Sequence, residues 1–127
     1  VRNLPDKFFV FSAFDSVSGK VTAEQSIDLR EKTYQSVSGI KGAINRKCSK
    51  IENYKTTTYD GVTVDAGAIK SRELIIYIPS STKDRKIDRS MYDEAQGAHN
   101  QFVASAKVVK FCHENHPDIK IITKELD

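Results

Sequence analysis

The chain has 127 residues, enough for one domain with a single hydrophobic core. Hydrophobic residues make up 39% and charged residues 29%, a balance that is ordinary for a globular protein and excludes a disordered chain. The formal net charge of +3 permits an anionic partner without requiring one. The longest apolar run, residues 74–78, is far shorter than the roughly 20 residues of a membrane span. We therefore expect one soluble domain over residues 1–127.

The two cysteines and the start of the chain bear on its compartment. No positively charged and then apolar leader opens the sequence. Cys48 and Cys112 could form one disulfide at most, and without a secretion signal we expect both as reduced thiols. The sequence therefore indicates an intracellular, cytoplasmic protein.

The first half of the chain predicts a strand, a helix and a second strand. Residues 7–15 predict a strand that is apolar on both faces. Thr22 lies three residues before Gln25, the spacing of a capping box, and apolar residues follow at helical spacing. We expect this helix to end at Gly39. Alternating apolar and basic residues in the segment 42–54 then predict a strand with one solvated face.

The second half predicts a hairpin, a strand, a helix and a last strand. Residues 55–72 contain glycines and threonines without a period, and we expect a hairpin extension and loop. Residues 73–78 predict a strand that is again apolar on both faces, followed by a polar loop over residues 80–89. The strongest helical stripe in the chain begins at Ser90, and residues 118–123 predict the closing strand.

The predicted order β-α-β-β-α-β indicates an α+β domain of the ferredoxin-like type. In this fold, two helices cover one face of an antiparallel four-stranded sheet. The first and third predicted strands are apolar on both faces, so an uncovered sheet face would form a large apolar patch. We therefore expect copies of the chain to cover this face for one another in an oligomer.

A cluster near the end of the chain resembles a metal site at first. Cys112, His113, Glu114 and His116 lie close together, but their spacing lacks the two separated ligand pairs of zinc sites. The simpler interpretation is a polar helix end, and we predict no metal. The sequence also has no Gly-x-Ser-x-Gly elbow and no phosphate-binding glycine loop, which disfavours ordinary hydrolases, kinases and dehydrogenases.

A basic run between residues 41 and 55 makes nucleic-acid binding an alternative. Its only acidic residue is Glu52, and its basic residues are Lys41, Arg46, Lys47, Lys50 and Lys55. Aromatic residues on predicted strands are typical of sheet-surface RNA-binding modules, but the Arg/Lys-Gly-aromatic signature of those modules is missing. A run of charge is most often only a solvated face.

Short motifs follow one another along nearly the whole chain. They are residues 8–14, the pair Leu29-Arg30, the Gly39-Ile-Lys-Gly42 step, the tyrosine turn of residues 57–61, Arg72-Glu73 at the third strand and the helix end of residues 111–118. Together they resemble the phage-encoded S-adenosylmethionine lyases, first described as S-adenosylmethionine hydrolases. The resemblance implies a trimer of ferredoxin-like sandwiches, with active sites between subunits and no metal or other cofactor.

The resemblance also implies a reaction and a set of site residues. The substrate carboxylate would attack its own γ-carbon, giving methylthioadenosine and homoserine lactone, and the loss of S-adenosylmethionine in the bacterial cytoplasm would counter host restriction. Tyr59 would lie near the sulfonium, and Glu73 would bind the amino group of the substrate. The further substrate-binding residues would be Glu114, Phe11, Ser12 and Ala13. Two alternatives stay open: a non-catalytic protein that binds nucleic acid or a nucleotide, and a subunit with only a protein partner.

Overall fold

The structure is a computed structural model that describes residues 2–3, 10–59, 61–79, 101–114 and 116–126. Its elements, in chain order, are β1 (Arg2–Asn3), β2 (Ala13–Asp15), β3 (Lys20–Ser26), the 3-10 helix η1 (Lys32–Tyr34), α1 (Val37–Glu52), β4 (Thr57–Tyr59), β5 (Val62–Val64), the 3-10 helix η2 (Ala66–Ala68), β6 (Ser71–Pro79), α3 (Gln101–His113) and β7 (Ile119–Leu126). Among these residues, no helix has the length and apolar character that crossing a membrane requires.

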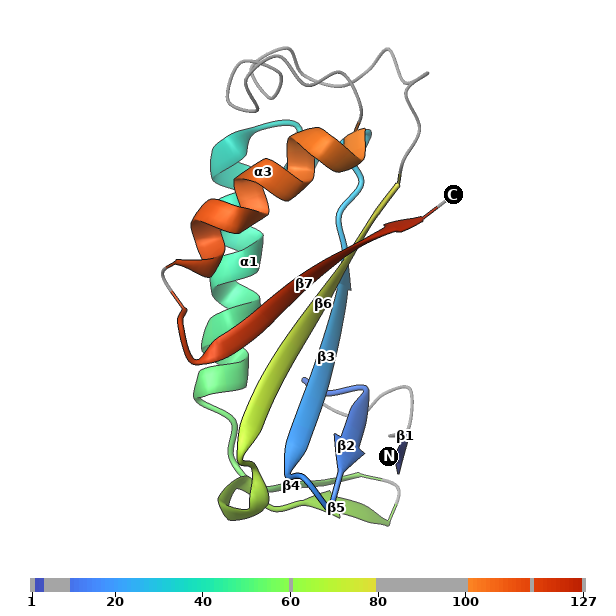
Figure 1. The fold of residues 1–127 in the computed structure, drawn as a ribbon, viewed down its shortest axis with the longest axis vertical. Coiled ribbons are helices and arrows are strands. Elements are labelled where there is room, and N and C mark those ends of the chain that lie inside the picture. The colour runs from blue at the N-terminus through green and yellow to red at the C-terminus, as the bar shows by residue number, and fades with distance from the viewer. Residues whose placement is uncertain (1, 4–9, 60, 80–100, 115, 127) are drawn as a thin grey trace.

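A mixed sheet in the order β1-β2-β3-β6-β7 forms the centre of the molecule (Figure 1). The first three of these strands pair antiparallel, whereas β3, β6 and β7 pair parallel. Parallel neighbours need long crossovers, and α1 and α3 lie in the two connections. The connection from β3 to β6 and the connection from β6 to β7 both move in the same direction across the sheet. Crossovers between parallel strands are nearly always right-handed, and two right-handed crossovers in one direction place their helices on the same face of the sheet, as Figure 1 shows.

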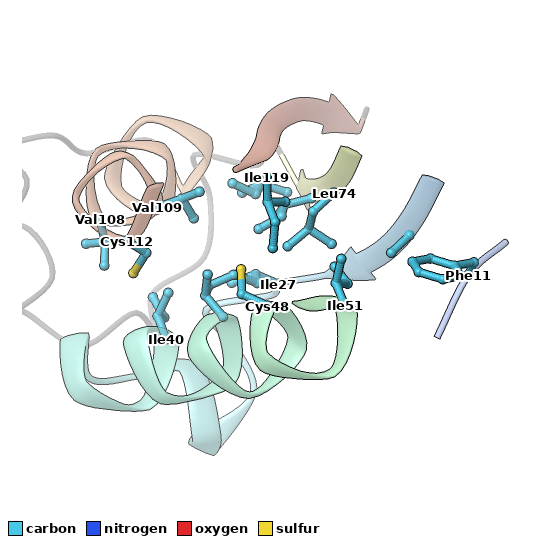
Figure 2. Packing of buried hydrophobic residues seen from close by; sticks show 14 of the residues in the cluster. Phe11, Ile27, Ile40, Cys48, Ile51, Leu74, Val108, Val109, Cys112 and Ile119 are labelled. Carbon is cyan, nitrogen blue, oxygen red and sulfur yellow. The ribbon is translucent and has the colours of Figure 1, made fainter. Parts of the chain in front are cut away.

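One hydrophobic core fills the space between the helices and the sheet (Figure 2). Its members include Ile40, Ile44, Cys48 and Ile51 of α1, Val108, Val109 and Cys112 of α3, and Leu74, Ile76 and Ile119 of the sheet. Each of these side chains is at most 1% exposed. The opposite side of the sheet, called the open face below, carries the alternate side chains of the strands, such as Thr22 and Glu73.

The α+β class is confirmed, but the described residues do not form the ferredoxin-like arrangement. That fold has an antiparallel sheet, whereas β3, β6 and β7 run parallel to one another. The cause lies in two misassigned elements. In place of the helix predicted from Thr22, the chain forms β3, where Val21 and Ala23 are buried and their neighbours are not.

The strand predicted over residues 42–54 is also wrong, because most of this segment belongs to α1. The buried residues Ile40, Ile44, Cys48 and Ile51 recur at the spacing of helical turns. Ser36 caps the start of this helix, since its Oγ accepts a hydrogen bond from the Gly39 N–H at 3.1 Å.

The first predicted strand, residues 7–15, forms only the short β2 among its described residues, whereas the predicted elements of the second half agree with the structure where it describes them. The hairpin of residues 55–72 is β4 and β5, the third predicted strand lies within β6, and the closing strand is β7. The described part of the second predicted helix is α3. The loop of residues 80–89, the start of that helix and residues 7–9 of the first predicted strand lie outside the described residues.

Gly39 lies in the first turn of α1 and does not end a helix. A Cβ at this position would lie 1.9 Å from the carbonyl oxygen of Thr33, a backbone atom that cannot turn away. We therefore expect Gly39→Ala to lower the free energy of unfolding by at least about 1–3 kcal/mol in denaturant titrations.

Gly42 is the matched control for this prediction. It lies in the same helix, and a Cβ there would approach only the end of the Arg46 side chain, at 3.3 Å. Gly42→Ala should leave stability unchanged or raise it by up to about 1 kcal/mol through helix propensity. Equal losses in the two variants would show that the contact with Thr33 does not matter.

Candidate functional site

An ion pair on the open face joins β3 to β6. Lys20 Nζ lies 3.3 Å from Glu73 Oε2, and the two side chains are 46% and 12% exposed. Asp15 of β2 is the cross-strand partner of Lys20. Asp15, Lys20 and Glu73 therefore lie on three neighbouring strands and are called the acid–lysine cluster below. Lys20 is half exposed, so the pair adds at most about 1 kcal/mol to stability.

The turn between β2 and β3 positions this cluster. Asp15 Oδ1 accepts a hydrogen bond from the Val17 N–H at 3.0 Å, and this contact holds the pKa of the Asp15 carboxyl below its usual value. Gly19 adopts a left-handed φ of 74°, and its carbonyl oxygen accepts the Lys70 N–H at 2.8 Å. The turn is thereby tied to the start of β6, which brings Lys20 beside Glu73.

The cluster offers two carboxylates and an ammonium group, which suits chemistry at a phosphate. A carboxylate can remove a proton from water, and an ammonium group can stabilise charge that develops on phosphate oxygens. Phosphodiester cleavage often uses metal ions. Within the described residues, no three His, Cys, Asp or Glu side chains come together to hold one. The chemistry proposed below rests on Glu73 and Lys20.

Three of the predicted site residues are close to one another in the sheet. Ala13 pairs with Thr22, and Thr22 pairs in turn with Glu73. Ser12 Oγ donates a hydrogen bond to the Thr22 carbonyl oxygen at 3.2 Å. Ser12 and Ala13 thus help to fix the strand on which Lys20 lies.

The other predicted site residues lie elsewhere. Phe11 is 2% exposed and packs against Tyr54 with ring centroids 4.7 Å apart, so it belongs to the core. Tyr59 ends β4 in the hairpin. Glu114 follows the end of α3 in the helix layer and is exposed, whereas Glu73 is on the opposite side of the sheet. The structure does not bring Phe11 or Glu114 together with Glu73.

His116 of the suspected metal cluster connects the end of the helix layer to α1. Its Nδ1 lies 2.6 Å from Glu52 Oε1, and its Nε2 lies 3.0 Å from Asn45 Oδ1. Both ring nitrogens are therefore used in contacts with one helix. The role of His116 is to hold the segment before β7 against α1.

The prediction of two reduced thiols is confirmed, because Cys48 and Cys112 are free and buried in the core (Figure 2). Burial, with smaller contributions from Glu52 and Cys112, raises the pKa of Cys48 to about 12. Burial also raises the pKa of Cys112. A thiol needs its thiolate form to act as a nucleophile, so neither cysteine is a catalytic candidate.

Four of the five basic residues of the run recognised in the sequence lie on one flank of α1 and just after it. Arg46, Lys47 and Lys50 share this flank, and Lys55 follows the helix; these four residues are called the basic flank below. Arg46 and Lys50 are one helical turn apart, where like charges repel each other. Burial, together with the charge of Lys50, lowers the pKa of Lys47.

Comparison with known proteins decides the family. A model of the family described as "CDI toxin restriction endonuclease-like domain" matches residues 1–122. The chain belongs to this family. A solved structure, the "CdiA-CT/CdiI toxin and immunity complex from Yersinia pseudotuberculosis", contains a similar chain with a TM-score of 0.70. The match covers 98% of this chain and 88% of that one, at 16% sequence identity, and it shows a shared fold. No curated protein matches the chain by sequence.

Membership in the toxin endonuclease-like family overturns the identification as an S-adenosylmethionine lyase. The predicted lyase reaction is therefore wrong. The predicted homotrimer with S-adenosylmethionine as partner and the alternative of a simple nucleotide-binding protein are not supported either. The motifs that carried the resemblance are short, and the structure gives their residues other roles. Gly39 and Gly42 lie inside α1 and form no step into a strand, and Arg72-Glu73 is the charged start of a buried strand.

Proposed function

We propose that the chain is the nuclease domain of a toxin, which cleaves phosphodiester bonds in nucleic acid. The observation that carries this proposal is the match of residues 1–122 to the CDI toxin restriction endonuclease-like family. The basic flank of α1 supports it, because basic residues are the usual contacts to a phosphate backbone.

The acid–lysine cluster is our candidate for the catalytic centre. Glu73 accepts a proton from a water molecule, whose oxygen then forms a bond to phosphorus. The ester P–O bond breaks, and the leaving oxygen takes up a proton from solvent. Lys20, 3.3 Å from Glu73, stabilises the extra negative charge on the phosphate oxygens in the transition state.

The basic flank and the cluster lie toward the same end of the molecule. The C-terminal end of α1, the β4–β5 hairpin and the starts of β3 and β6 gather there (Figure 1). A phosphate backbone held by Arg46 and Lys50 can therefore continue around this end toward Glu73. Phosphate contacts position a nucleic acid without selecting its sequence, so we expect little sequence preference from this surface.

We further propose that a protein inhibitor binds this domain and that the domain acts in the cytoplasm of a bacterial cell. The similar solved structure is that of a toxin with an immunity protein, which supports the first point. The buried free thiols suit a reducing compartment.

The test of the proposed nuclease function is cleavage of nucleic acid by the purified chain, with plasmid DNA and structured RNA as separate substrates.

A further inference from the structure

A hollow with a volume of about 380 Å³ opens where α1 meets the β4–β5 hairpin. Its lining residues are Ser49, Lys50, Asn53, Tyr54, Lys55 and Thr57. Small-molecule sites usually have volumes of about 300–1,000 Å³, so a single nucleotide is of suitable size.

Tyr54 gives this hollow a preformed wall. Its hydroxyl donates a hydrogen bond to the Val64 carbonyl oxygen at 2.8 Å and accepts one from the Thr57 N–H at 3.1 Å. Its ring packs on Phe11 of the core. The end of α1 is thus joined to both strands of the hairpin, and a ligand would not have to order this wall when it binds.

The charges at the hollow favour an anion. Two of the lining residues, Lys50 and Lys55, are basic and exposed, and none is acidic. Within the described part of the chain, neither lysine forms a salt bridge. The lining surface is mostly apolar, and such walls suit the base and the sugar of a nucleotide.

We propose that this hollow is a nucleotide subsite that receives one nucleoside monophosphate unit of the bound nucleic acid. The ammonium groups of Lys50 and Lys55 bind the phosphate, and the base and sugar lie against Tyr54. The inference rests on the proposed function and deepens it, since it gives the strand a fixed point beside the basic flank. Lys50 and Lys55 belong to both surfaces, which makes the surfaces continuous.

The test uses adenosine 5′-monophosphate as the probe, titrated into the full chain and followed by calorimetry and by backbone amide NMR shifts. We expect saturable binding with shifts at Lys50, Asn53 and Lys55. Adenosine and inorganic phosphate should each bind at least about tenfold more weakly than the monophosphate, because each lacks one half of the recognised group.

A matched pair of serine variants locates the binding. Ser49 and Ser38 are both exposed residues of α1, but only Ser49 lines the hollow. Ser49→Phe fills the hollow and should weaken nucleotide binding at least about tenfold. Ser38→Phe should leave binding unchanged. Binding that is equal in the two variants, or equal for adenosine and its monophosphate, would overturn the subsite.

The possible outcomes distinguish a failure of the nucleotide subsite from a failure of the proposed nuclease function. If the wild-type chain cleaves nucleic acid but does not bind the monophosphate, the subsite is wrong and the nuclease proposal stands. If the monophosphate binds and Ser49→Phe abolishes the binding, but no nucleic acid is cleaved, the hollow is a nucleotide site and the nuclease proposal is wrong.

Discussion

Replacing Glu73 with glutamine is expected to reduce cleavage of nucleic acid by about 10²–10⁴-fold while the fold is retained. Glutamine has the size of glutamate but cannot accept a proton from water, and removal of a general base typically costs this much in rate. The substitution also removes the ion pair with Lys20. Because the Lys20 side chain is half exposed, the free energy of unfolding should fall by no more than about 1 kcal/mol. The measurement is the initial rate of cleavage, alongside the thermal melting of each variant.

Glu24 supplies the control for this variant. It is an exposed glutamate on β3, and Glu24→Gln makes the same chemical change on the open face of the sheet. We expect its rate to stay close to that of the wild type. Wild-type rates in Glu73→Gln would remove Glu73 from the catalytic centre, and equal losses in both variants would assign the effect to the charge of the open face.

Reversing two charges of the basic flank should have the second largest effect. The double variant Arg46→Glu, Lys50→Glu replaces two cations with two anions on exposed positions of α1. We expect binding to a DNA duplex to weaken by tenfold or more near physiological salt. The slope of log K against log salt should become shallower by about 1.8, since each lost phosphate contact removes about 0.9. Fluorescence anisotropy across a salt series measures both quantities.

A second double variant separates position from net charge. Lys110 of α3 and Lys124 of β7 are exposed and lie outside the basic flank. Lys110→Glu, Lys124→Glu changes the net charge by the same amount and should reduce the affinity and the slope much less. If the two double variants lose affinity equally, net charge alone governs binding and α1 is not the interface.

The parts of the fold that local sequence predicts are those with a strong local pattern. The continuous apolar run of β6, bounded by Pro79, and the apolar stripe of α3 need no information from elsewhere in the chain. The start of α1 was obscured by Gly39, which usually indicates a helix end but here permits a close approach to Thr33. Its buried residues follow a helical period that the alternation of Ile44, Arg46, Cys48 and Lys50 concealed.

The assignment of β3 failed for a different reason. The Thr22–Gln25 spacing is that of a capping box, and pairing with β2 and β6 stabilises an extended conformation there. The alternation of buried Val21 and Ala23 with Lys20, Thr22 and Glu24 was the available signal. A parallel pair depends on contacts that are far apart in sequence, which local patterns do not contain.

The candidate site was foreseen only in pieces. Glu73 was selected through a resemblance that proved wrong, and its position beside Lys20 depends on the register between β3 and β6. The basic run was recognised but placed on a strand, where Arg46 and Lys50 would alternate with apolar residues across a sheet. On α1 the same residues share one flank, and this placement turns a run of charge into a candidate surface for a phosphate backbone.

The most direct measurement is the cleavage of plasmid DNA and structured RNA by the purified chain, with and without Mg²⁺, followed on gels and by end-group analysis. We predict that the wild type shortens at least one of these substrates and leaves a phosphate at one new end and a hydroxyl at the other. Intact substrates after prolonged incubation with a folded wild-type chain, under every one of these conditions, would contradict the account.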